Sequence, residues 1–275
     1  MKLTVGLSTI CVHPQSIQGI LEDLANQTVK IREIIVCVQC KDSQCVKEKY
    51  RSHINGMDLN FKVQIITSTE FGVLKSRNIV MSACSGDILL FADDDCRYPD
   101  DCCASVISPF IENTDIVAAS YKISVNHRGD VFKPYPDNVF MHNKISAQRV
   151  NMISLAIVIE YVRVNQIKFD ERFGHGTRFP SCGENIFLCD ILDRSGVAIY
   201  HPSHVVIHPK DSSGGRLGCS RTLEAKGAGF YRMFGIGGSV LCLIFAIKKS
   251  KDIRSFARLL KYLYLGYIYG LAYIK

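Results

Sequence analysis

The alternation of apolar runs and amphipathic segments over the first hundred residues is the strongest constraint on the fold. The apolar runs have the length and composition of strands, and the segments between them place apolar residues at helical spacing. The expected strands are 3–10, 33–38, 61–67 and 87–92, and the expected helices are 16–26, 45–54 and 74–84. Repeated strand and helix units of this kind predict an α/β protein with a doubly wound sheet that is covered by helices.

Polar side chains follow the expected strands, at the sheet edge where ligands bind in such folds. Thr9 follows the first strand, Gln39 follows the second, and Asp93, Asp94 and Asp95 follow the fourth. Three consecutive carboxylates repel one another, so the triplet favours a site for a divalent cation. Carboxylate oxygens suit Mg²⁺ or Mn²⁺. A solvated acidic turn or a helix N-cap is the alternative.

Four residues elsewhere in the chain have the chemistry of a nucleotide or transfer site. Arg77 lies near a helix start, where it can meet a base or phosphates; the alternative is a solvated helix residue. Glu184 opens a helical run with one apolar face, which makes it a candidate general base or a helix-capping carboxylate. His208 can complete a metal shell, and Lys210 can neutralise diphosphate charge.

The charge of the chain is unevenly distributed. Residues 201–275 hold 12 of the 33 Lys and Arg residues and 3 of the 26 Asp and Glu residues, a balance of +9. Residues 1–200 therefore hold 21 basic and 23 acidic residues, a balance of −2. A near-neutral body with a basic tail indicates that the tail meets an anionic surface, either a membrane or a nucleic acid.

The composition of the tail favours the membrane. The apolar run 236–247 is shorter than the about 20 residues that cross a bilayer. The run 253–273 is expected to form a helix with five apolar or aromatic residues on one side, namely Phe256, Leu259, Leu260, Leu263 and Tyr267. With cations near the other side, this pattern is typical of an interfacial helix. The alternative is a pair of helices packed on the body. Nucleic acid is not expected, because the aromatics lie among aliphatic residues without polar base-reading residues.

The compartment is predicted from the start of the chain and from its thiols. The opening run is strand-like and is followed at once by Pro14 and polar residues, so no signal peptide is expected. The 12 cysteines are then expected to be reduced, in a cytosolic compartment. Cys37 and Cys40 have the spacing of a redox or zinc half-site, but no second pair at zinc spacing accompanies them.

Several segments, in this order, resemble motifs of the family 2 glycosyltransferases, which have the GT-A fold. They are the strand ending at Thr9, the strand 33–38, Gly72 with Arg77 and Asn78, 91–95 in place of the DxD motif, 169–174 as the FDErF segment, 183–188 at the acidic helix, and His208. The resemblance covers roughly residues 1–210 and implies a mixed, Rossmann-like sheet. It also implies a catalytic domain over 1–215, with a nucleotide-sugar half (1–100) and an acceptor half (101–215). The composition of the remaining segment predicts a basic, apolar helical tail over 216–275.

The resemblance also implies roles in donor binding. Asp93 would face the ribose or the base, and Asp95 would hold the metal together with His208. Thr9, Asp94, Arg77 and Lys210 would contact the nucleotide sugar. Gln39 stands where the family frequently has a carboxylate, and its amide can present a donor and an acceptor to uracil or thymine, with uracil favoured.

The acceptor side departs from the family at one position. The usual acidic pair is Glu-Asp, whereas this chain reads Glu184-Asn185, so Glu184 alone can take a proton. A single base without a dedicated nucleophile fits an inverting displacement.

The expected function is an inverting transfer of a hexose, galactose or glucose, from a UDP-sugar with Mn²⁺ or Mg²⁺ as cofactor. By resemblance to enzymes of bacterial O-antigen or capsule synthesis, the acceptor would be a saccharide on a polyprenyl diphosphate, at the cytoplasmic face of the inner membrane. Two alternatives are a sugar-nucleotide nucleotidyltransferase and a non-catalytic membrane adaptor. The first lacks its usual Gly-rich phosphate loop near the N-terminus, and the second leaves the acidic triplet unexplained.

Overall fold

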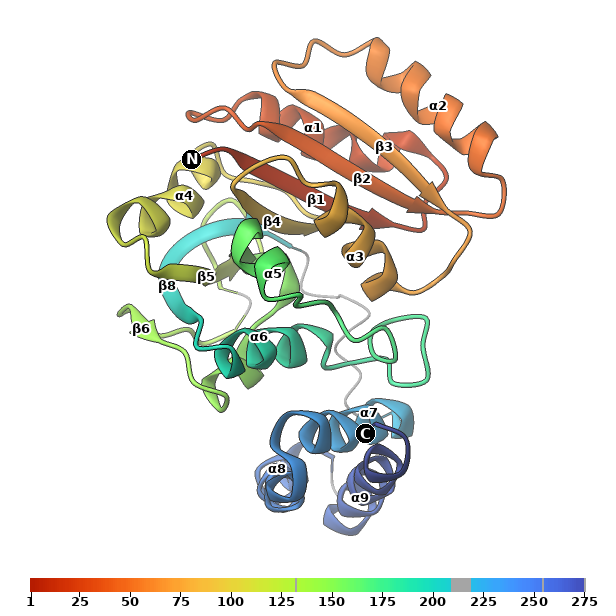
Figure 1. Ribbon diagram of the computed structural model, residues 1–275, viewed down its shortest axis with the longest axis vertical. Coiled ribbons are helices and arrows are strands. Elements are labelled where there is room, and N and C mark those ends of the chain that lie inside the picture. The colour runs from red at the N-terminus through yellow and green to blue at the C-terminus, as the bar shows by residue number, and fades with distance from the viewer. Residues whose placement is uncertain (132, 209–218, 254, 275) are drawn as a thin grey trace.

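This computed structural model describes residues 1–131, 133–208, 219–253 and 255–274. The strands within these residues form one eight-stranded sheet (Figure 1). The strands are β1 (Leu3–Thr9), β2 (Glu33–Gln39), β3 (Lys62–Ser68), β4 (Ile88–Asp93), β5 (Ile116–Ser124), β6 (Phe140–Met141), β7 (Leu155–Val158) and β8 (Val197–Ile207). The α-helices are α1 (Gln18–Ala25), α2 (Ser43–Asn55), α3 (Val73–Ala83), α4 (Cys102–Glu112), α5 (Ile159–Val164), α6 (Gly183–Asp193), α7 (Ser220–Phe234), α8 (Gly238–Ile253) and α9 (Phe256–Tyr273). The short 3-10 turns are η1 (Pro14–Ile17), η2 (Ser146–Arg149), η3 (Met152–Ser154) and η5 (Gly235–Gly237).

The sheet has a parallel half and a mixed half. Its strand order is β3-β2-β1-β4-β7-β5-β8-β6, and the first four strands run parallel. β7 is antiparallel to both β4 and β5, β8 is parallel to β5, and β6 is antiparallel to β8. The mixed α/β sheet expected from the sequence is therefore confirmed, and the parallel half comes from residues 3–93.

The central strands are buried on both faces because helices cover both sides of the sheet. Every residue of β1 and β2 is buried, which explains why these segments read as continuous apolar runs. The observed ends of the first four strands lie within one residue of the expected ones. The strands β5, β6 and β7 and the short helix α5 were not predicted from the sequence, whereas α7 lies within the expected helical tail.

The C-terminal helices α7, α8 and α9 pack against one another at one end of the molecule (Figure 1). A side chain at Gly227 of α7 would collide with the backbone of Leu263 in α9, so this glycine permits the close crossing of the two helices. By length and composition alone, the helical stretch Ser220–Ser250 is sufficient to cross a membrane. It is divided, however, by the turn Gly235–Gly237, where Gly235 has a φ of +56°.

The apolar face of α9 differs from the one expected. Leu259 and Leu263 are fully buried against the neighbouring helices, because α9 uses them to pack on α7 and α8. The exposed apolar residues of α9 are Phe256, Leu265, Ile268, Tyr269, Leu271 and Tyr273. Those of α8 follow a helical spacing and are Val240, Leu243, Ile244 and Ile247.

The tail helices share a hydrophobic core with the body of the protein. The cluster that contains Cys182 and Phe187 also contains Leu223 and Phe230 of α7 and Leu263 of α9. The buried faces of these helices thus pack on the body, which was the alternative kept open from the sequence. The expected division between residues 215 and 216 lies outside the described residues and stays a prediction.

Candidate active site

A cavity of about 570 Å³ lies where β1, β2 and β4 end. Of the residues proposed from the sequence, those that line it are Thr9, Gln39, Arg77, Asp93, Asp94, Asp95, Glu184 and His208. Lys210 lies outside the described residues. A larger hollow of about 970 Å³ between α3 and α5 contains none of them, so its size alone does not make it the candidate site.

Each carboxylate of the acidic triplet has a different partner. The guanidinium of Arg77 donates from Nη2 to Asp93 Oδ1 at 2.7 Å. The Thr9 hydroxyl donates to Asp94 Oδ2. Nε2 of His208 lies 3.1 Å from Asp95 Oδ1. Because the three partners come from α3, from β1 and from the end of β8, the fold offsets the mutual repulsion of the triplet.

Asp95 and His208 form the part of the site best suited to a divalent cation. The hydrogen bond with His208 is the main reason that the pKa of the Asp95 carboxyl is lowered, so this carboxylate is ionised at neutral pH. Its side chain is 51% exposed, so it can also reach a ligand in the cavity. Among the described residues no group of three His, Cys, Asp or Glu side chains is arranged to hold a metal. Two protein ligands suit an ion that completes its shell with water and substrate phosphate oxygens.

Arg77 brings a buried positive charge to the cavity. Its side chain is 7% exposed, and its Nε has no hydrogen-bond partner within the described part of the chain. The Ser8 hydroxyl, which lines the same cavity, is also buried without a partner there. Buried donors left unsatisfied cost free energy, so Arg77 and Ser8 are candidates for contact with a ligand oxygen in this cavity.

The structure separates the two residues of the Glu-Asn pair. Glu184 lies in the first turn of α6 and lines the cavity. Asn185 is buried instead, and its side-chain amide donates to the carbonyl oxygens of Ala147 at 2.9 Å and of Val150 at 3.4 Å. Glu184 is therefore the group of this pair that can act on a substrate, and Asn185 fixes the helix start to the segment before η3.

Gln39 is held by the chain itself. Its Nε2 donates to the carbonyl oxygens of Glu70, at 2.7 Å, and of Gly72, at 2.9 Å, and its Oε1 accepts from the amide of Gly72 at 3.4 Å. Gln39 therefore fixes the loop that leads into α3. A role for Gln39 in base recognition requires an exchange of these hydrogen bonds, and this role remains a prediction.

No residue of one wall of the cavity was singled out from the sequence, although the loop 174–182 as a whole is expected to carry specificity. This wall consists of Phe71, Asn151, Met152, Ile153, His175 and Gly176. Most of these residues lie in 3-10 turns and loops, which have no periodic pattern. The available signal was the pair Gly174 and Gly176, whose positive φ angles mark an irregular loop just after the FDErF segment.

Comparisons with known proteins identify the family and the fold of this chain. The family described as Glycosyl transferase family 2 matches residues 9–180. An uncharacterized glycosyltransferase of Haemophilus influenzae is 24% identical over 204 residues, which are 72% of this chain and 66% of that protein. The chain thus aligns with just under two thirds of the length of this curated relative.

Two solved structures are similar in fold. The mannosyltransferase PcManGT from Pyrobaculum calidifontis, in complex with GDP-Man and Mn²⁺, superposes with a TM-score of 0.62 at 14% identity, over 98% of this chain and 87% of that one. S. aureus TarS 1-349 in complex with UDP-GlcNAc superposes with a TM-score of 0.61 at 17% identity, over 92% of this chain and 74% of that one. Identities this low show a shared fold and no more. Because the family match covers more than half of the sequence, and the mixed sheet with its cavity is that of the GT-A fold, this chain belongs to glycosyl transferase family 2.

Proposed function

We propose that this family 2 glycosyltransferase is an inverting enzyme that transfers a hexose, galactose or glucose, from a UDP-sugar to a lipid-diphosphate-linked saccharide. The observation that carries the proposal is the single cavity that is lined by the acidic triplet, Arg77 and Glu184. Glycosyl transfer requires charge stabilisation at the leaving diphosphate and a base for the acceptor hydroxyl in one site. These residues offer both.

The donor is proposed to bind along β1, β4 and the start of α3. Arg77 donates to an oxygen of the nucleotide, while Asp93 keeps the guanidinium in place through their 2.7 Å hydrogen bond. Asp95 and His208 would hold Mn²⁺ or Mg²⁺, and such an ion would supply Lewis-acid stabilisation of the leaving diphosphate. The neighbouring fold of PcManGT was solved with GDP-Man and Mn²⁺, and that of TarS 1-349 with UDP-GlcNAc, which supports a nucleotide-sugar donor.

The acceptor is proposed to enter beside α6. Glu184 takes the proton of the attacking hydroxyl, and the oxygen then displaces UDP from the anomeric carbon in one step, with inversion. No second carboxylate is required as a nucleophile in such a displacement. The wall formed by η3 and the 174–176 loop lies next to Glu184 in the cavity and would contact the acceptor sugar.

The proposed place of work is the cytoplasmic face of the bacterial inner membrane, in the synthesis of O-antigen or capsule repeats. The exposed apolar residues of α8 and α9 support a contact with lipid, as does the positive balance of +9 over residues 201–275. An acceptor carried on a polyprenyl diphosphate would be presented at this same surface.

The proposal is tested by UDP release from a panel of nucleotide sugars, with Mn²⁺ and a synthetic lipid-diphosphate saccharide. We expect turnover with a UDP-hexose that depends on the acceptor, and its loss in the variants Asp95→Ala and Glu184→Ala. Asp100→Ala serves as the control, because this exposed carboxylate does not line the cavity, so the variant should leave turnover unchanged. Full turnover in either of the two cavity variants would contradict the assigned roles. Turnover with a different nucleotide sugar alone would contradict the UDP-hexose donor.

A further inference from the structure

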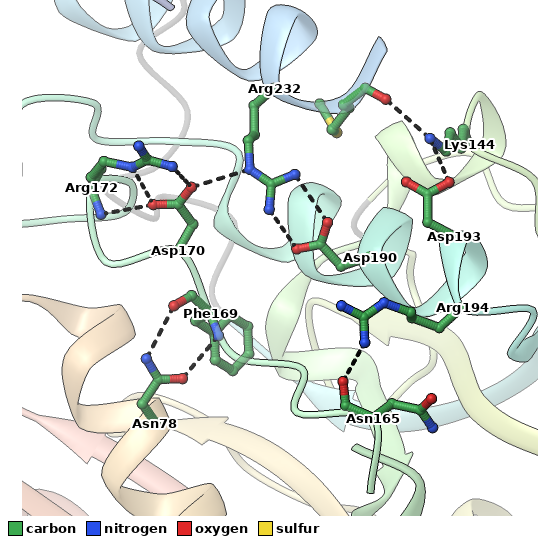
Figure 2. A network of polar contacts seen from close by, with 11 residues as sticks. Asn78, Lys144, Asn165, Phe169, Asp170, Arg172, Asp190, Asp193, Arg194 and Arg232 are labelled. Atoms are coloured by element: carbon green, nitrogen blue, oxygen red, sulfur yellow. Dashed lines mark hydrogen bonds and ion pairs between the residues drawn. The ribbon is translucent and has the colours of Figure 1, made fainter. Parts of the chain in front are cut away.

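A branched ion-pair network joins the tail to the acceptor side of the cavity (Figure 2). Arg232 of α7 donates from Nη1 and Nη2 to the two carboxylate oxygens of Asp190, at 3.0 and 2.9 Å. The Nε of Arg232 donates to Asp170 Oδ2 at 3.3 Å. The Asp170 side chain is 9% exposed and that of Asp190 is 21% exposed, so water screens these contacts much less than those of a surface pair. One guanidinium thus connects two carboxylates from different segments.

The two carboxylates belong to the segments that form the acceptor side. Asp190 lies on α6, the helix whose first turn carries Glu184. Asp170 begins the 170–182 segment, which contributes His175 and Gly176 to the cavity wall. Arg232 therefore links α6 directly to this segment.

Further contacts extend the network in both directions. Arg172 pairs with Asp170 at 2.7 Å, and its Nη1 also donates to the carbonyl oxygen of Tyr273 at the end of α9, at 3.3 Å. On the other side, the side-chain amide of Asn78 donates to the carbonyl oxygen of Phe169, at 3.1 Å, and accepts from its amide, at 2.9 Å. Asn78 follows Arg77 on α3, so the network reaches the donor side of the site (Figure 2).

A second contact places α7 directly on the start of α6. A Cβ at Gly229 of α7 would lie 3.0 Å from the Sγ of Cys182, so the two segments are in close contact. Cys182 is the N-cap of α6 and has a φ of 74°, a left-handed conformation that is rare for a residue with a side chain. The chain makes this turn two residues before Glu184, under the cover of α7.

We propose that Arg232 is a positioning residue for the transfer reaction, which makes the C-terminal helices part of the catalytic unit. By holding Asp190 and Asp170 together, Arg232 fixes α6 and the 170–182 segment in register, so that Glu184 reaches the acceptor hydroxyl. This inference rests on the function proposed above, in which Glu184 is the base. A planar guanidinium is required, because it can bind one carboxylate through two parallel hydrogen bonds and a second carboxylate through Nε, whereas a lysine ammonium is a point charge.

The test compares Arg232→Lys with the double variant Arg232→Gln/Asp190→Asn. In acceptor-dependent UDP release, we expect kcat to fall about 10- to 100-fold in both, because a small displacement of a catalytic group has effects of this size. The KM for the donor should stay within about twofold of the wild-type value, since the donor contacts are unchanged. The double variant leaves no unpaired charge at Asp190, and Asp170 keeps its pair with Arg172, so its urea midpoint should stay close to that of the wild type.

The matched control is Asp193→Asn, which makes the same chemical change on the same helix. Asp193 pairs with Lys144 at 2.7 Å and is 51% exposed, and we expect its kcat to be unchanged. A wild-type kcat in Arg232→Lys or in the double variant would overturn the proposal, as would an equal loss in Asp193→Asn. Failure of the proposed function is a separate result, because it would show as absent turnover in the wild-type enzyme itself.

Discussion

The variant Arg77→Met tests whether the buried guanidinium of the cavity binds the donor. Methionine retains an unbranched apolar stem, so the packing around the start of α3 is largely kept. The variant loses the 2.7 Å hydrogen bond with Asp93 and the unpartnered Nε donor. Both losses fall on the donor side of the cavity.

The structure sets the size of the expected effects. A hydrogen bond from a charged donor contributes about 1.5–3 kcal/mol, and about 1.4 kcal/mol corresponds to a tenfold rate change. Loss of one such bond to the donor should therefore lower kcat/KM for the nucleotide sugar about 10- to 150-fold. Asp93 is 36% exposed, so water can solvate it once Arg77 is gone, and the free energy of unfolding should fall by only about 1–2 kcal/mol.

The assay measures initial rates of UDP release over a range of donor concentrations at saturating acceptor, together with urea unfolding. Lys75→Met is the matched control, because Lys75 lies on the same helix and pairs with the exposed Glu70 at 2.7 Å, outside the cavity. The control should leave both kcat/KM and stability unchanged. A folded Arg77→Met protein with kcat/KM within twofold of the wild-type value would refute the reasoning.

Three further outcomes are expected. Chelation of the metal by EDTA should abolish UDP release, and added Mn²⁺ should restore it. The variant His208→Ala should require a higher Mn²⁺ concentration for its half-maximal rate. Turnover that persists in EDTA would exclude this metal role. Burial lowers the pKa of His142 to about 4, so the unfolded chain binds this proton near pH 6.5 while the folded chain does not. Stability should therefore fall between about pH 6.5 and 4, by up to about 3 kcal/mol, and urea unfolding of His142→Gln should show a flatter pH dependence; an unchanged slope would contradict this origin. Ile244→Asp on α8 should reduce sedimentation of the protein with anionic vesicles. The control Ile111→Asp on α4 should not, although the Ile111 side chain is 61% exposed and that of Ile244 is 53% exposed. Equal sedimentation of the two variants would argue against lipid contact through α8.

The donor half could be predicted from sequence because its strands are central and parallel. Segments such as β1 and β2 are buried on both faces, so their apolar runs are unambiguous and their ends locate Thr9 and the acidic triplet. Each expected position of this half is brought to one cavity. Glu184 could be placed as well, because an apolar helical face begins beside it.

The acceptor half could not be predicted in the same way. β6 has two residues and β7 has four, which is too short for a pattern to stand out from the surrounding chain. The wall at η3 and the 174–176 loop depends on turns that pack against the sheet and against the start of α3, so local propensity alone does not set their geometry. For α9 the period was read correctly, but its buried face could not be known without its partner helices, which is why Leu259 and Leu263 were assigned to the wrong environment.

The pairing of β5 with β8 has a consequence for the order in which the protein is made. Asp95 leaves the ribosome with the first half of the chain, but His208 follows more than a hundred residues later, at the end of the strand that aligns with β5. Arg232, which holds α6, is translated later still. A nascent chain can therefore form the parallel half of the sheet while its cavity is incomplete. A product truncated before His208 would retain the acidic triplet but lack this histidine and the helices that hold α6, so sugar transfer should begin only after the segment that carries Arg232 has been made.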